Sequence, residues 1–122
     1  MKQADVVVNA TPLTPATNNF FEVLKPSAYF INIGRGKSVV TKDLVTALKS
    51  GKLAGAVLDV IEPEPLPENH ALWRLPNVII TPHISGYSDL VMARFWVFVR
   101  ENLRRYVSGE KMLNEVNIDK GY

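Results

Sequence analysis

The sequence contains no cysteine and only two histidines among its 122 residues. Disulfide bonds and thiolate metal sites are therefore excluded, and with two histidines as the remaining nitrogen ligands we expect no metal site. No apolar run approaches the roughly 20 residues that a transmembrane helix needs. The first ten residues, MKQADVVVNA, also lack the apolar core of a signal peptide. We expect a soluble, cytoplasmic protein that does not bind membranes.

Charge of one sign is also scarce, because the net charge is only +2. The densest basic cluster, Arg100, Arg104 and Arg105, has a spacing more typical of a solvated helix face than of a nucleic-acid-binding surface. We therefore expect no nucleic-acid partner. With 47% hydrophobic residues, the chain is long enough to form one globular domain with its own core.

The chain does contain an alternation of short apolar runs and helical patterns. Four runs are apolar throughout, which is typical of parallel strands that are buried on both faces. These runs lie at 5–10, 28–33, 53–60 and 77–81. A short helix is predicted around 20–24 and a longer one over 41–50, with Thr41 as its N-cap and Gly51 as its stop. The pattern predicts an α/β fold with a parallel sheet.

The second half of the chain holds a proline-rich segment and a long amphipathic pattern. Prolines interrupt residues 61–76, which predicts a long loop without regular structure, and we expect a structural role for His70 within it. A long helix is predicted from Ser85 to about Gly109, with an apolar stripe at helical spacing. The stripe consists of Met92, Phe95, Trp96, Phe98, Val99, Leu103 and Tyr106. We expect these side chains to be core residues rather than to stack on a cofactor.

Polar residues follow the predicted strands at the points where ligands of open parallel sheets bind. These residues are Thr11, Arg35, Asp59, Glu64 and His83. Taken together they favour a specific chemistry, in which a guanidinium binds a carboxylate, an imidazole transfers a proton and an acid orients the imidazole. Taken singly, each has a plainer explanation as a turn residue, a solvated charge or a hydrogen-bonded loop histidine.

The segment FINIGRGKSVV, residues 30–40, allows three interpretations of its Gly-Arg-Gly turn. The turn could cradle phosphate, could simply point Arg35 at water, or could hold Arg35 close to a small anionic substrate. A dinucleotide fingerprint requires G-x-G-x-x-G, and Val39 stands where the third glycine should be. The segment is therefore not a phosphate loop.

Five blocks in order resemble the C-terminal portion of the D-isomer-specific 2-hydroxyacid dehydrogenases, the family of phosphoglycerate dehydrogenase and the glyoxylate/hydroxypyruvate reductases. The blocks are ADVVVNATPLTPAT, LKPSAYFINIGRGKSVV, AGAVLDVIEPEPLP, LWRLPNVIITPHISG and ENLRRYVSGEKMLNEVN. The resemblance implies the second half of a Rossmann-type parallel sheet, with about four strands, flanking helices and a long C-terminal helix. Residues 1–108 would be the C-terminal half of an NAD(P)-binding domain, and residues 109–122 a tail that returns to the substrate domain.

The resemblance also implies roles for particular residues in hydride transfer between a nicotinamide cofactor and C2 of a small 2-hydroxy or 2-oxo acid. Arg35 would bind the substrate carboxylate, His83 would be the acid/base, and Glu64 would pair with it. NAD or NADP would be lined by Thr11, Pro12, the backbone of Ile33 and Gly34, Arg35, Asp59, His83, Ser85 and Gly86. The two glycines would let the backbone pass close to the nicotinamide while Arg35 faces the substrate. The segment TPATNNFFEVLKPSA is shorter than its counterpart in the family, which implies a truncated helix there.

The chain contains no G-x-G-x-x-G sequence, and the substrate domain of the family lies outside its matching region. We therefore expect the isolated chain to bind cofactor poorly and to be inactive. The alternative is a catalytically silent folding or dimerisation module, and a transcriptional co-regulator on the same scaffold is also conceivable. Without a neighbour, Val6–Val8 would form an unpaired apolar strand edge, from which we expect a homodimer.

Overall fold

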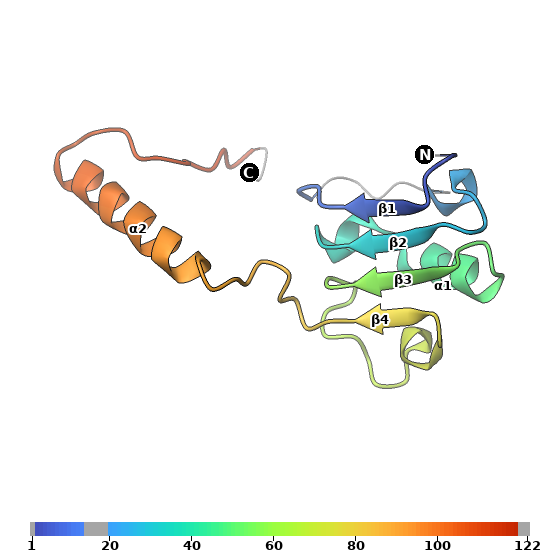
Figure 1. The fold of residues 1–122 in the computed structure, drawn as a ribbon. Helices are drawn as coiled ribbons and strands as arrows, with labels where there is room; N and C mark the ends of the chain where they lie inside the picture. Colours follow the sequence, from blue (N-terminus) through green and yellow to red (C-terminus); the bar gives the residue numbers. More distant parts are fainter. Residues whose placement is uncertain (1, 14–19, 120–122) are drawn as a thin grey trace. The chain divides into compact units, whose positions relative to one another are not determined.

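The computed structural model describes residues 2–13 and 20–119, and its first part is a sheet of four parallel strands (Figure 1). The strands are β1 (Val6–Asn9), β2 (Tyr29–Asn32), β3 (Gly55–Leu58) and β4 (Val78–Ile80). They lie side by side in sequence order, and each neighbouring pair is parallel. This arrangement confirms the predicted α/β fold. Each strand is shorter than its apolar run, because the residues at the ends of the run belong to the connecting turns and do not pair with a neighbouring strand.

The helix α1 (Thr41–Lys49) connects β2 to β3, and it begins and ends almost where the sequence predicts. Gly51, with a φ of +73°, follows its last turn as expected. The predicted N-cap is wrong, because Val40 occupies that position. The Thr41 hydroxyl instead donates a hydrogen bond to the Glu62 carbonyl at 2.7 Å, which ties α1 to the loop after β3.

Three short 3₁₀ helices complete the described connections of the sheet. They are η1 (Phe20–Val23), η2 (Gly36–Ser38) and η3 (Ala71–Arg74). The first confirms the short helix predicted around 20–24, whereas the truncation implied for this segment falls partly on residues 14–19, outside the described residues. The loop 61–76 is not wholly irregular as predicted, because the proline-free stretch 71–74 forms η3. His70 caps η3 by accepting a hydrogen bond from the Leu72 amide at 3.3 Å, which confirms its structural role.

The hydrophobic core lies on one face of the sheet. Phe30 of β2 and Leu58 of β3 pack there with Leu48 of α1 and with η1 and η3. On the opposite face Val8 and Ile79 remain exposed, and β1 and β4 contain no fully buried residue. The prediction of strands buried on both faces is therefore wrong for the edge strands of this chain. A uniformly apolar strand shows that both faces can be covered, but it does not identify what covers them.

The chain divides into two units, Met1–Ser85 with the sheet and Gly86–Tyr122 with the helix α2 (Val91–Val107). The predicted boundary at residues 108/109 stays a prediction. The helix begins later than predicted, because residues 85–90 are not helical and form two turns, at 85–86 and 89–90. In the described residues no helix combines the length and the apolar character needed to cross a membrane.

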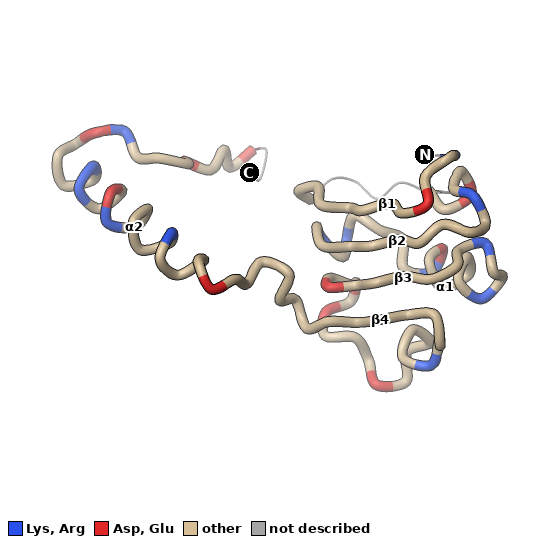
Figure 2. Tube along the Cα trace, viewed as in Figure 1, with Lys and Arg blue, Asp and Glu red and all other residues tan. Residues whose placement is uncertain are grey.

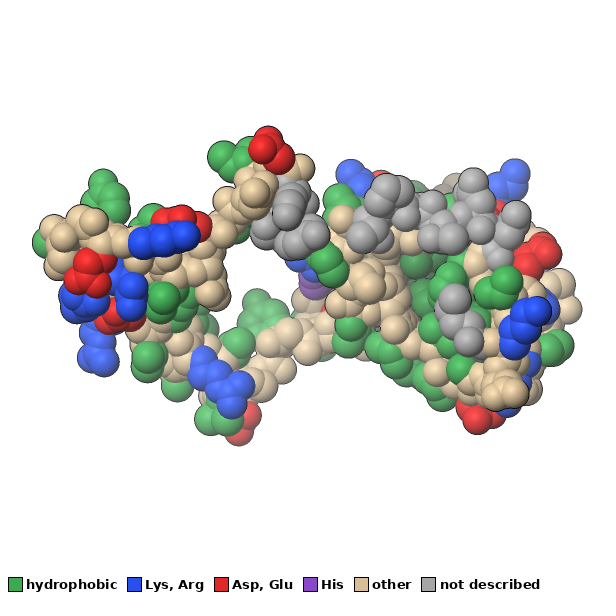
Figure 3. Space-filling model, turned by 90° about the horizontal axis from the view of Figure 1, so that it is seen from above, with side chains coloured by type: hydrophobic (Ala, Val, Ile, Leu, Met, Phe, Trp, Pro, Cys, Tyr) green, Lys and Arg blue, Asp and Glu red, His purple; other side chains and the backbone are tan. Residues whose placement is uncertain are grey.

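Within its own unit most of the apolar stripe of α2 is uncovered, and only Phe98 and Val99 are half-buried. No residue of α2 is buried, Trp96 is 61% exposed, and its closest aromatic neighbour is Phe95 on the same helix, with ring centroids 6.0 Å apart. Figure 3 shows hydrophobic side chains protruding along this unit. The prediction that these residues are core stays a prediction, because helical spacing identifies an apolar face but not its partner surface.

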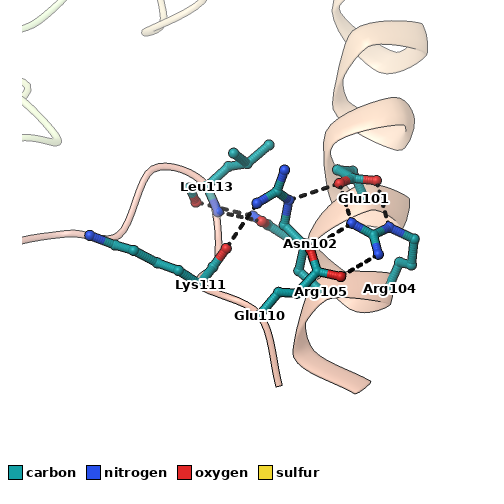
Figure 4. Close-up of polar contacts among 7 residues, drawn as sticks. All are labelled: Glu101, Asn102, Arg104, Arg105, Glu110, Lys111 and Leu113. Carbon is teal, nitrogen blue, oxygen red and sulfur yellow. Dashed lines mark hydrogen bonds and ion pairs between the residues drawn. The ribbon is translucent and has the colours of Figure 1, made fainter. Parts of the chain in front are cut away.

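The basic cluster of α2 is largely neutralised by acidic neighbours in the same unit (Figures 2 and 4). Arg104 binds Glu101 at 3.0 Å and Glu110 at 2.6 Å, and Arg105 binds Glu101 at 2.8 Å. Hydrogen bonds from Arg104 and then Arg105 lower the pKa of Glu101 to about 2. The Asn102 side chain pairs with both the N–H and the carbonyl of the Leu113 backbone. These contacts fold the segment after α2 back along its last turns.

Candidate active site

The candidate site lies at the carboxyl ends of the four strands, where the chain leaves each strand for a turn. Because all four strands run in the same direction, these turns share one edge of the sheet. The edge carries the segments 9–13, 33–38, 59–66 and 81–85. The side chains singled out from the sequence in the sheet unit all come from these segments.

Glu64 and His83 form a direct contact across this edge. The Nδ1 atom of His83 lies 2.8 Å from Oε1 of Glu64, although the two residues are 19 positions apart. Glu64 comes from the loop after β3 and His83 from the turn after β4, so the parallel pairing of these strands brings them together. The side chain of His83 is 53% exposed and that of Glu64 is 41% exposed. The imidazole is thus half-exposed, and its other nitrogen, Nε2, takes no part in the contact with Glu64.

The backbone of His83 has a φ of +56°, in the left-handed region that side chains other than glycine rarely adopt. Such a conformation costs about 1–3 kcal/mol and persists only where neighbouring contacts enforce it. Its neighbours supply those contacts, because the amides of Ile84 and Ser85 both donate to Asp59 at 2.9 and 2.8 Å. Asp59 therefore holds the turn that presents His83.

Asp59 is only 4% exposed, yet its carboxylate is fully hydrogen-bonded. Besides the two amides it accepts the Thr81 hydroxyl at 2.5 Å and the Ser85 hydroxyl. Burial opposes ionisation, but the hydrogen bonds from Ser85, Thr81 and the Ile84 amide outweigh it and hold the pKa of Asp59 well below its usual range. Asp59 is thus ionised and committed to the turn 81–85, while its implied contact with the cofactor stays a prediction.

Arg35 follows β2 and shares a hollow with Glu64. The hollow has a volume of about 330 Å³, and Leu13 and Pro63 also line it. The Nη1 atom of Arg35 donates a hydrogen bond to the carbonyl of Gly34 at 2.8 Å, so the guanidinium is folded over its own turn. A cation, a carboxylate and an imidazole therefore lie within one region of the sheet edge.

The glycines on either side of Arg35 are required by close approaches within the protein. A Cβ on Gly34 would lie 2.7 Å from the Thr11 carbonyl oxygen, and one on Gly36 would lie 1.9 Å from the Ile61 carbonyl oxygen. The sequence-based explanation, that these glycines make room for the nicotinamide, is therefore not needed to account for them. The Arg35 turn, residues 34–36, therefore packs tightly between the loop after β1 and the loop after β3.

The remaining predicted cofactor residues occupy the same edge, with one exception. Thr11 and Pro12 are exposed after β1, and the Thr11 hydroxyl donates to Asn9 at 2.8 Å. Ile33 is exposed after β2, and its amide donates to the Asn9 carbonyl at 2.9 Å. Gly86 is the first residue of the other unit, so its role stays a prediction.

The sequence reasoning missed a group of polar residues beneath the Arg35 turn, namely Asn9, Asn32 and Ser38. A signal was present in the sequence, because β1 and β2 both end in asparagine after an apolar run. Parallel pairing places Asn9 opposite Asn32, and an amide buried in such a position needs hydrogen-bonding partners.

Comparison with known proteins identifies the class to which this fold and site belong. The family model of the D-isomer specific 2-hydroxyacid dehydrogenase NAD-binding domain matches residues 1–85. The chain therefore belongs to the D-isomer specific 2-hydroxyacid dehydrogenase family, as its sequence blocks predict.

Individual relatives agree with this assignment. The chain is 43% identical over 121 residues to the human glyoxylate reductase/hydroxypyruvate reductase, which covers 95% of the chain and 37% of the relative. It also resembles the structure of the NADPH-dependent glyoxylate/hydroxypyruvate reductase of Sinorhizobium meliloti in complex with NADP and sulfate, with a TM-score of 0.85 and 36% identity over 99% of the chain and 41% of that protein.

A third relative is a D-isomer specific 2-hydroxyacid dehydrogenase from Xanthobacter autotrophicus in complex with NADPH and MES, with a TM-score of 0.84 and 39% identity over 98% of the chain and 50% of that protein. Against the curated relatives, the chain spans about two fifths of their length, between 37% and 41%.

Proposed function

We propose that this chain supplies the acid/base and substrate-binding residues of an enzyme that transfers hydride reversibly between a nicotinamide cofactor and C2 of a small 2-hydroxy or 2-oxo acid. One observation carries the proposal, which is the 2.8 Å contact of His83 with Glu64 beside a hollow lined by Arg35. The strained backbone of His83 adds support, because such strain is concentrated at functional sites.

Each of these three side chains has a role that follows from its chemistry. In the reducing direction His83 protonates the oxygen at C2 through Nε2, the nitrogen that Glu64 does not contact. Glu64 holds Nδ1, which fixes the ring orientation and stabilises the protonated imidazole. The Arg35 guanidinium binds the substrate carboxylate through two parallel N–H donors, which sets the position of C2 relative to His83.

The nicotinamide cofactor, when bound, supplies or accepts the hydride at C2. The residues at the sheet edge fit such a group, because Thr11, Pro12 and Ile33 leave the carboxyl ends of β1 and β2 exposed beside Arg35. The cofactor is NAD or NADP, in line with the NAD-binding domain of the family. Ser85 and Gly86, which follow the His83 turn, would complete the lining.

The chain by itself carries only part of what such an enzyme needs. It contains no glycine-rich phosphate loop, so we expect the isolated chain to bind cofactor weakly and to turn over little or no substrate. A silent folding or dimerisation module remains the alternative function. The cytoplasmic location and the homodimer expected from the sequence also stay predictions.

A chimera tests the proposal directly. In it, these 122 residues replace the matching segment of the Sinorhizobium meliloti reductase, and NADPH-dependent reduction of glyoxylate is measured. We expect an active chimera, with Glu64→Gln lowering kcat at least about tenfold because glutamine lacks the negative charge that stabilises the protonated imidazole. Glu68→Gln, in the same proline-rich loop, is the matched control and should leave kcat unchanged. Equal activities of the two variants would refute the proposed role of the Glu64–His83 pair.

Arg35→Lys in the same chimera tests the carboxylate-binding role. A single ammonium cannot reproduce a two-donor fork, so the KM for glyoxylate should rise by about tenfold or more while the KM for NADPH stays close to its original value. An unchanged KM for glyoxylate would reduce Arg35 to a turn residue.

A further inference from the structure

We propose that Asn32 and Ser38 are positioning residues for Arg35. Both hydrogen-bond the backbone carbonyl of Arg35, and they thereby set where its guanidinium meets a substrate carboxylate. This inference rests on the proposed function of Arg35. Its physical basis is a hydrogen-bond network that ties the ends of β1, β2 and β3 together beneath the Arg35 turn.

Asn32 is the centre of this network. It is only 1% exposed, and its amide group is fully hydrogen-bonded. Its oxygen accepts from the Asn9 side chain at 2.9 Å and from the Gly34 amide at 3.3 Å. Its nitrogen donates to the carbonyls of Arg35 at 3.3 Å and Val60 at 3.4 Å. Only one orientation of the amide satisfies two donors and two acceptors, so Asn32 holds both ends of the turn in fixed register.

Ser38 donates to the same carbonyl. Its hydroxyl donates to the Arg35 carbonyl at 2.6 Å and accepts from the Asn9 side chain at 2.7 Å. Asn9 in turn accepts from the Thr11 hydroxyl at 2.8 Å. The Arg35 carbonyl therefore receives two side-chain hydrogen bonds, and a continuous polar network links it to the loop after β1.

One hydrogen bond ties the Arg35 guanidinium to this hydrogen-bonded turn. Arg35 is folded over the turn by its own bond to the Gly34 carbonyl, whose amide is held by Asn32. Gly36 is pressed against the Ile61 carbonyl, so the turn has no room to relax in that direction. A change in the network therefore displaces the Arg35 guanidinium or increases its mobility. A displaced guanidinium binds a carboxylate less well.

Ser38→Ala tests the network in the 122-residue chain itself, because it removes one hydroxyl from a half-buried position. Amide hydrogen exchange and ¹⁵N relaxation should show faster exchange and greater mobility at residues 34–39. Ser50→Ala is the matched control, because its hydroxyl also donates to a backbone carbonyl, that of Ala47 at 3.2 Å, but at the far end of α1. An Arg35 turn as ordered in Ser38→Ala as in the control would overturn the proposal.

Kinetics in the chimera supply the functional measurement. Removing one hydrogen bond to the turn should raise the KM for glyoxylate by roughly three- to tenfold, with the KM for NADPH and kcat within about twofold of their original values. Ser38→Thr retains the hydroxyl and should restore the KM. Equal rises in both KM values, or no rise despite a loosened turn, would contradict a positioning role.

The two measurements separate this inference from the proposed function. If the chimera proves inactive but Ser38→Ala still loosens residues 34–39 in the chain, the network holds Arg35 while the proposed function fails. If the chimera is active and Ser38→Ala changes neither mobility nor KM, the proposed function stands and this inference is wrong.

Discussion

A methyl group on Gly36 would collide with the backbone of the neighbouring loop. The new Cβ would lie 1.9 Å from the carbonyl oxygen of Ile61 and 2.2 Å from its carbonyl carbon. Ordinary contact begins at 3.4 Å, so the Arg35 turn and the loop after β3 must separate by about 1.5 Å. Neither partner is a flexible side chain, and both belong to segments that are held by hydrogen bonds on either side.

We expect Gly36→Ala to lower the free energy of unfolding by about 3 kcal/mol, the upper end of the cost of overpacking a well-packed site. For a unit of this size that corresponds to a fall in the melting temperature of roughly 12–24 °C. Thermal unfolding followed by circular dichroism or calorimetry measures both quantities. The same displacement would also move Arg35, so the chimera carrying this change should bind glyoxylate weakly.

Two other glycines provide controls for the collision. Gly86→Ala introduces a Cβ with nothing within 4 Å and should change the stability by less than about 0.5 kcal/mol. Gly51→Ala also meets no atom, but its φ of +73° should cost about 1–2 kcal/mol through backbone strain alone. A melting temperature of Gly36→Ala equal to that of Gly86→Ala would refute the wedged position of the Arg35 turn.

Two further changes probe other parts of the account. Asp59→Asn should lower the free energy of unfolding at pH 7 by at least about 1.5 kcal/mol. Because the folded pKa of Asp59 is lowered, its stabilisation is present above about pH 4 and is lost as the pH falls. The free energy of urea unfolding should therefore fall less steeply with acidification in the variant than in the wild type, and identical pH profiles would contradict this. Asn102→Ala should speed amide exchange at Leu113, since the variant loses both hydrogen bonds to that backbone, and unchanged exchange would remove this anchor.

The sequence predicted the location of the site better than its internal support. Four apolar runs implied parallel strands, and parallel strands bring their carboxyl ends to one edge, so the proximity of Glu64 and His83 followed from topology. The network around the Arg35 carbonyl did not follow, because the partners of Asn32 come from the end of β1 and from the turns after β2 and β3. Likewise, the clash that requires Gly36 depends on the path of the backbone at Ile61, 25 residues further along the chain.

The exposure of α2 illustrates a different limit. The spacing of Trp96 and its neighbours correctly predicted a helix with an apolar face, since local periodicity reports on secondary structure. Burial depends on a second surface, and no local pattern in the sequence identifies that surface. The same reasoning explains why β1 and β4 are apolar throughout and yet partly exposed.

The central claim, that His83 is the acid/base of this site, is tested most directly by comparing His83→Gln with His70→Gln in the chimera. Proton transfer from a positioned acid contributes about 10²–10⁴-fold, so kcat for glyoxylate reduction should fall by that factor in His83→Gln. His70 caps η3 and has no contact with Glu64 or His83 among the described hydrogen bonds, so His70→Gln should retain kcat within about threefold of the original. A folded His83→Gln chimera that reduces glyoxylate as fast as His70→Gln would contradict the account.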